Sequence, residues 1–75
     1  MALFLVPIVR QGKQSLWRDW ANGAVTDEIS AALRQGDLGQ EIQIKARNKQ
    51  EAAIDAERQR PGFVAIRESI LRLGR

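Results

Sequence analysis

The sequence predicts a small α+β domain, and three observations lead to that expectation. Residues 41–47 alternate between polar and apolar side chains, which is the period of a half-buried strand. Asn48 then has the chemistry of a helix N-cap, and Pro61 requires the helix to end by Arg60. The N-terminal run 2–9 is apolar and rich in branched side chains, as in a buried strand. We therefore expect a small three-stranded sheet with two or three short helices packed on one face.

The N-terminal strand is expected to lie within the core, because both of its faces carry apolar side chains. Pro7 has no amide to donate to a neighbouring strand, so this side of the strand should meet an edge or a bulge. Residues 2–9 are too few to cross a bilayer, and they lack the basic flank and the cleavage pattern of a signal peptide. We expect a soluble cytoplasmic protein without a membrane partner.

Two short helices should follow this strand. Ser15 is a candidate N-cap for a helix over 16–21, whose apolar stripe contains Trp17 and Trp20. Thr26 is a candidate N-cap for a second helix, which Gly36 ends. Both helices are amphipathic, which is typical of helices that pack against a core.

The helix after Asn48 presents a narrow face of alanines, which would allow a close approach to a sheet. Glu51 stands three residues after Asn48, as in a capping box. A further strand is expected to begin at Phe63. Beyond Glu68 the spacing of apolar residues fits either a strand or a helix.

The composition excludes most catalytic chemistry. The chain has 75 residues, which suits one domain over 1–75, and it contains no Cys and no His. Disulfides, thiolate metal sites and imidazole bases are therefore ruled out, and the serine hydroxyls have no imidazole to activate them. We expect no catalytic residue, no metal and no cofactor, and we predict that the protein is not an enzyme.

The net charge of +3 is unevenly placed. Residues 1–40 carry four Lys/Arg and four Asp/Glu, whereas residues 41–75 carry eight Lys/Arg and five Asp/Glu. A basic half of this kind could neutralise phosphates. The chain offers no aromatic stacking platform there, because Phe63 is the only aromatic residue in that half. Nucleic-acid binding is thus an alternative function, with these candidate contacts: Lys45, Arg47, Lys49, Arg58 and Arg60.

A second set of candidate contacts lies on the first helix. Trp17, Arg18 and Trp20 are of the residue types most enriched at protein-binding hot spots, although two tryptophans on one stripe also suit a core. An open strand edge would offer another route to a partner, although Lys45 and Arg47 of the strand 41–47 would discourage casual edge pairing. We expect a non-catalytic binding protein that docks on a macromolecule as an inhibitor, adaptor or accessory subunit, such as a phage or mobile-element regulator. The sequence is also compatible with a homo-oligomer.

Overall fold

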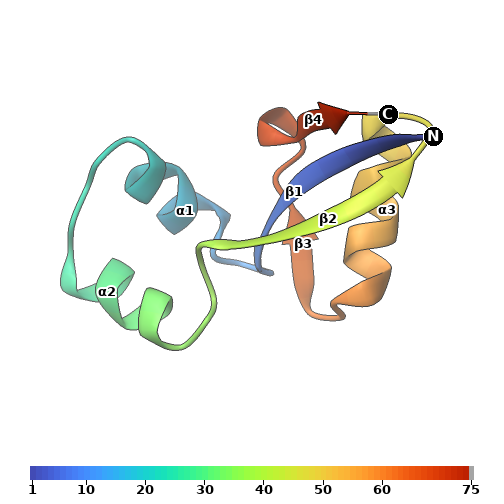
Figure 1. Cartoon of the computed structure of the whole chain (residues 1–75). Coiled ribbons are helices and arrows are strands. Elements are labelled where there is room, and N and C mark those ends of the chain that lie inside the picture. The colour runs from blue at the N-terminus through green and yellow to red at the C-terminus, as the bar shows by residue number, and fades with distance from the viewer. Residues whose placement is uncertain (75) are drawn as a thin grey trace.

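The computed structural model describes residues 1–74 and is built around one long central strand (Figure 1). The elements follow each other in this order: β1 (Ala2–Arg10), α1 (Gln14–Ala21), α2 (Asp27–Arg34), β2 (Gln40–Ala46), α3 (Lys49–Gln59), β3 (Phe63–Ala65), the 3₁₀ turn η1 (Arg67–Ser69) and β4 (Leu71–Gly74). The predicted α+β class is confirmed.

The sheet has four antiparallel strands, one more than expected. β2 pairs with one side of β1, and both β3 and β4 pair with the other side, at opposite ends of β1. Residues 63–74 therefore form two short strands separated by η1, which resolves the ambiguity beyond Glu68 except at residue 75, which lies outside the described residues.

Pro7 lies at the gap between β3 and β4, the two strands that pair with the same side of β1. Its carbonyl accepts a hydrogen bond from the amide of Ile66 at 2.9 Å, immediately after β3. In an antiparallel ladder a residue's amide and carbonyl point to the same side, so the missing amide of Pro7 also faces Ile66. The predicted irregularity on this side of β1 is confirmed, and β4 adds a register shift between Leu3 and Phe4.

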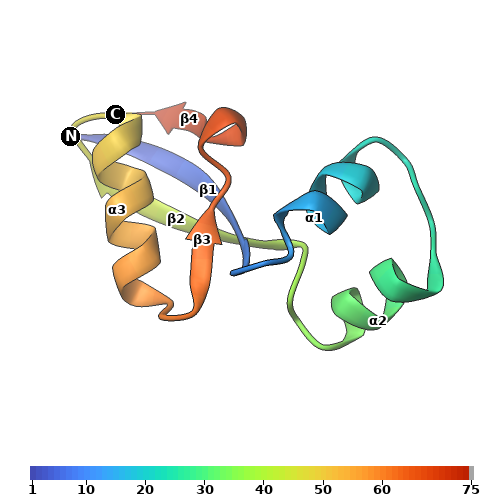
Figure 2. The same ribbon diagram turned by 180° about the vertical axis from the view of Figure 1, so that it is seen from behind.

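One face of the sheet packs against α3. The even-numbered side chains of β1 from Ala2 to Ile8 and the apolar side chains of β2 form this core with three alanines of the helix, Ala52, Ala53 and Ala56, all of them 0% exposed. Without side chains longer than a methyl group on that stripe, the helix backbone can lie close to the strands. Figure 2 shows α3 in front of the strands, whereas Figure 1 shows it behind them.

The other two helices do not share that face, contrary to the expectation that all helices pack on one side. α1 and α2 lie beyond one end of the sheet (Figure 1). Their core centres on Val9, an odd-numbered residue of β1 whose side chain points away from α3, and it includes Ile29, Leu38 and Ile66. The helices therefore lie on opposite sides of β1.

Two of the three predicted N-caps are confirmed. Thr26 Oγ1 accepts from the amide of Ile29 at 3.1 Å, and Asn48 Oδ1 accepts from the amide of Glu51 at 2.8 Å. Ser15 is not an N-cap, because α1 begins earlier, with Lys13 at the cap position and no side-chain cap bond. The carbonyl of Lys13 starts the helix by accepting from the amide of Trp17 at 3.1 Å.

Among residues 1–74, no helix is both long enough and apolar enough to cross a membrane.

Candidate functional site

Part of the sheet face opposite α3 is not covered by a helix. Leu3 and Leu5 of β1 point to this side and are only half-buried, although the sequence indicated that they lie inside the core. Leu71 of β4 stands directly opposite Leu5 and is 58% exposed. We call these three leucines the open face. On the β2 side it is bordered by Gln43, opposite Leu5, and Lys45, opposite Leu3.

A groove continues the open face towards α1. It has a volume of about 250 Å³ and is lined by Pro7, Trp17, Trp20, Gly39, Gln40, Glu41 and Ser69. Pro7 is the next residue after Leu5 on the same face of β1, and it is buried at the floor of the groove, so the groove lies next to the open face. We call this cavity the Trp groove.

The two tryptophans have different environments within the Trp groove. Trp17 is half-buried and packs against the core formed by Val9 and Ile29. Trp20 is 36% exposed and presents its ring to the groove. Trp17 thus contributes to both the core and the groove wall, whereas Trp20 is the more accessible of the two.

Gly39 allows Trp20 to lie close to the loop before β2. Gly39 has a φ of +76°, and a Cβ at this position would lie 3.5 Å from Cη2 of Trp20 and 3.3 Å from Cδ2 of Leu33. Both the backbone conformation and the crowding therefore favour glycine here. No particular feature of the sequence identified this residue as part of the groove.

The side chain of Arg18 links α1, the tryptophan helix that carries Trp17 and Trp20, to the turn η1 that precedes β4. Its Nη2 donates to Oε1 of Glu68 at 3.2 Å, and both side chains are more than half exposed. A backbone hydrogen bond, and then the hydrogen bond from Arg18, hold the pKa of Glu68 below its ordinary value of 4.5. Arg18 is therefore engaged within the chain and positions α1 beside the open face.

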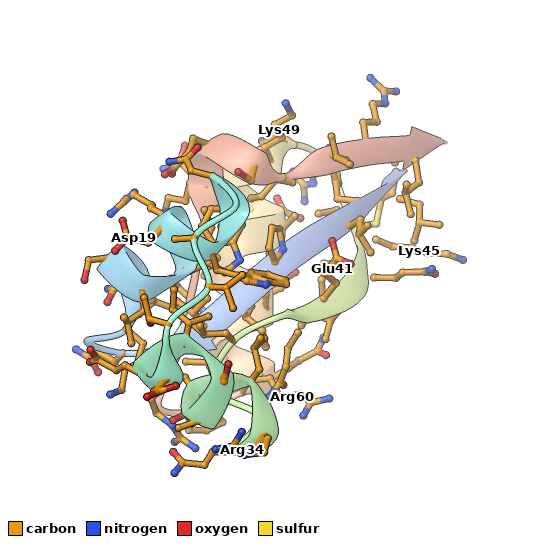
Figure 3. All side chains as sticks on the ribbon, turned by 90° about the vertical axis from the view of Figure 1, so that its left-hand side faces the viewer. Asp19, Arg34, Glu41, Lys45, Lys49 and Arg60 are labelled. Atoms are coloured by element: carbon orange, nitrogen blue, oxygen red, sulfur yellow. The ribbon has the colours of Figure 1, made fainter. Side chains whose placement is uncertain are left out.

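The predicted basic contacts are not brought together by the fold. Lys45 lies on β2, whereas Lys49 and Arg60 lie at opposite ends of α3. Figure 3 shows the side chains of Lys45, Lys49 and Arg60 extending in three different directions. Arg58 lies in the last turn of α3, and Arg47 lies 3.9 Å from the carboxylate of Glu51.

Two further arginines are also paired with carboxylates. Nη2 of Arg67 lies 3.2 Å from Oε1 of Glu57, and Nε of Arg10 lies 3.2 Å from Oδ1 of the buried Asp37. Arg10 also stacks on the ring of Phe63 at 4.5 Å from the ring centroid. Much of the excess positive charge is thus locally balanced or spread over several faces.

Sequence reasoning identified Trp17, Arg18 and Trp20 but not the open face beside them. A signal for it existed in the polar side of β2, namely Glu41, Gln43 and Lys45. Because paired strands share their faces, a polar side on β2 implies that the same side of β1 is partly exposed to solvent. The exposure of Leu71 could not be derived in this way, since its pairing with Leu5 was not foreseen.

No metal centre is formed by the part of the chain that the structure describes: residues 1–74 contain no group of three or more His, Cys, Asp or Glu side chains placed to hold an ion.

Comparison of the chain with models of protein families, with curated proteins and with solved structures gives no match.

Proposed function

We propose that this chain is a non-catalytic, cytoplasmic binding protein that docks on a protein partner through the open face and the Trp groove. The observation that carries the proposal is the continuity of these two surfaces. Trp20, Leu5 and Leu71 lie along the side of the sheet that α3 does not cover, with the buried Pro7 at the floor of the groove between Trp20 and Leu5. A contiguous apolar surface with a polar border is typical of a protein interaction site.

The groove suits a side chain of a partner better than a reacting substrate. The hydroxyl of Ser69 and the carboxylate of Glu41 line the groove, but neither has an imidazole or a thiol to work with, because the chain contains no His and no Cys. Tryptophan rings supply a large and rigid contact area at a low cost in conformational entropy. An apolar anchor residue of a partner protein matches such a surface.

The charge around the groove also favours a protein over a nucleic acid. Glu41 lies in the groove wall and Glu68 lies on the turn against which α1 rests, so phosphate groups would meet carboxylates there. The basic residues that could bind phosphate extend in separate directions. A phosphate backbone is bound by several cations along one surface. An inhibitor, an adaptor or an accessory subunit is consistent with this arrangement.

The proposal is tested by affinity capture from the native host, followed by binding measurements with the purified partner. Trp20→Ala removes the accessible ring, and Leu71→Glu places a charge on the open face. Val25→Glu is the matched control, because Val25 is 84% exposed and precedes α2, away from the open face. We expect Trp20→Ala to weaken binding by about thirtyfold, which corresponds to about 2 kcal/mol for a hot-spot residue.

Leu71→Glu should weaken the same complex, whereas Val25→Glu should leave the affinity within about twofold. Circular dichroism of each variant checks that the fold is retained. Equal binding by all three variants would reject the open face as the contact. Capture that disappears after nuclease treatment would instead support nucleic-acid binding.

A further inference from the structure

The outer edge of β2 has no partner strand within residues 1–74. β2 pairs with β1 along all seven of its residues, without a register shift, and the sheet ends there. The strand contains no proline and no bulge, two of the devices by which proteins protect an edge. Its regular backbone therefore offers a template for another strand.

The backbone amides and carbonyls that point outward from this edge belong to Glu41, Gln43 and Lys45. The bond between Ile66 and Pro7 shows that the odd-numbered backbone groups of β1 point away from β2, so its even-numbered groups point towards it. Even residues of β1 stand opposite even residues of β2, as in the pair of Val6 with Ile42. The odd-numbered amides and carbonyls of β2 must therefore point outward.

The charges along this edge are complementary to those of the same edge in a second copy of the chain. Gln43 is the midpoint of β2, with Glu41 two residues before it and Lys45 two residues after it. If a second copy pairs antiparallel about a two-fold axis at Gln43, then Glu41 faces Lys45 of the second copy, and Lys45 faces its Glu41. All residues of the strand take part, and the three outward-pointing residues of each copy give about six backbone hydrogen bonds.

Other alignments of the same edges are less favourable, because they lose charge complementarity or extend beyond β2. A parallel, in-register pair would place Glu41 opposite Glu41 and Lys45 opposite Lys45, and like charges directly opposite each other are destabilising. A two-fold axis at Ile42 would place Lys45 opposite Gly39 of the second copy and leave its charge unpaired. An axis at Ile44 would place Glu41 opposite Arg47 of the second copy, but Arg47 lies beyond the end of β2 and already lies 3.9 Å from Glu51.

We infer that β2 is a homodimerisation strand, and that two copies of this chain join through it into one continuous antiparallel sheet. Because the two-fold axis stands perpendicular to the sheet, both α3 helices lie on the same face, and the two open faces meet on the other. The half-buried Ile42 then stands opposite the buried Ile44 of the second copy, which adds an apolar neighbour across the interface. Figure 3 shows Glu41 and Lys45 both on β2, and Glu41 also lines the Trp groove.

This inference does not rest on the proposed docking function. The side chains of Glu41 and Lys45 also border the Trp groove and the open face, but the dimer forms through the outward backbone groups of β2 and is measured in the purified chain alone. A monomer could still bind a partner protein, and a dimer could fail to do so. The variants chosen to test the dimer therefore leave Trp20 and Leu71 unchanged.

The test is a pair of charge reversals measured by sedimentation equilibrium over a range of protein concentrations. Glu41→Lys and Lys45→Glu each place like charges opposite each other at both symmetric contacts. Each variant alone should raise the dimer dissociation constant by about tenfold or more. An equimolar mixture of the two variants should recover association, because the lysine at 41 of one chain then faces the glutamate at 45 of the other.

Matched controls carry the same charge changes at exposed positions away from β2. Asp19→Lys on α1 and Arg34→Glu on α2 should dimerise as the unchanged chain does. A third variant, Gln43→Pro, removes an outward amide that the chain's own sheet does not use, so it should abolish the dimer while the circular dichroism spectrum is retained.

Three outcomes would overturn the inference. The first is an unchanged chain that stays monomeric up to about millimolar concentration. The second is a dimer that both single reversals leave intact, which would place the contact on another surface such as the open face. The third is a mixture of the two reversed chains that associates no better than either chain alone.

Discussion

Nη2 of Arg18 lies 3.2 Å from Oε1 of Glu68, in a pair whose members are 50 residues apart in the sequence. This contact joins the helix that carries both tryptophans to the turn between β3 and β4. It therefore determines where one wall of the Trp groove stands relative to the open face. Because both side chains are well exposed, its effect is expected to be on position more than on stability.

The pKa of Glu68 gives a direct measure of this pair. Its folded pKa lies below the ordinary value of 4.5, so its contribution to stability is present above that value and is lost as the pH falls through the folded pKa. Arg18→Ala should raise this pKa in an NMR titration. The rise should be incomplete, because the backbone hydrogen bond, the larger cause, remains. A pKa that does not move would show that Arg18 does not contact Glu68 in solution.

Glu68→Gln should correspondingly change the pH dependence of stability. The stability difference between the unchanged chain and this variant should be present at about pH 6 and should shrink at an acidic pH below the folded pKa, where the carboxylate is protonated in both folded and unfolded chains. Thermal unfolding at the two pH values measures it. A difference that is the same at both pH values would contradict the assigned cause.

Gly39→Ala should destabilise the chain more than Gly12→Ala does. Both glycines have a positive φ, of +76° and +91°, so each substitution incurs a backbone cost of about 1–2 kcal/mol. A Cβ at Gly12 meets nothing within 4 Å, whereas at Gly39 it meets Leu33 and Trp20. Chemical denaturation gives the two free energies of unfolding, and their difference isolates the contact. A shift of tryptophan emission in Gly39→Ala alone would report the displaced ring of Trp20.

Asn48→Ala should lower the free energy of unfolding by about 1 kcal/mol, because the amide of Glu51 loses the acceptor at the start of α3. Ser15→Ala is the control. Ser15 is exposed within α1 and makes no cap bond, so its replacement should change stability by less than about 0.5 kcal/mol. Equal losses in the two variants would mean that the cap of α3 has no energetic role.

Ala53→Leu should cost about 1–3 kcal/mol, because Ala53 is 0% exposed between α3 and the sheet and has no room for three more carbons. Ile54→Leu, one residue further along the same helix, should be close to neutral, since Ile54 is 38% exposed. Urea titrations compare the two variants, which introduce the same residue at a buried and at an exposed position of one helix. A neutral Ala53→Leu would show that α3 can move away from the strands.

Local chemistry in the sequence determined the helix boundaries and the main strands. The caps at Thr26 and Asn48 connect residues only three apart, and the alternation of β2 needs no partner to be visible. The wrong expectation for Ser15 has the same local origin. A serine near the start of an amphipathic stripe resembles a cap, but the carbonyl of Lys13 begins the helix earlier.

What the sequence by itself determined was the α+β class, most of the elements and the residue types suited to a protein interface. Only the tertiary structure decided that β1 lies at the centre, that α3 and the α1–α2 pair take opposite sides of it, and that Leu71 stands exposed opposite Leu5. It also separated Lys45, Lys49 and Arg60, which the sequence places within one stretch. The physical reason is that strand pairing and the direction of each helix depend on contacts between residues far apart in the chain, whereas periodicity and capping act within a single turn or a single strand.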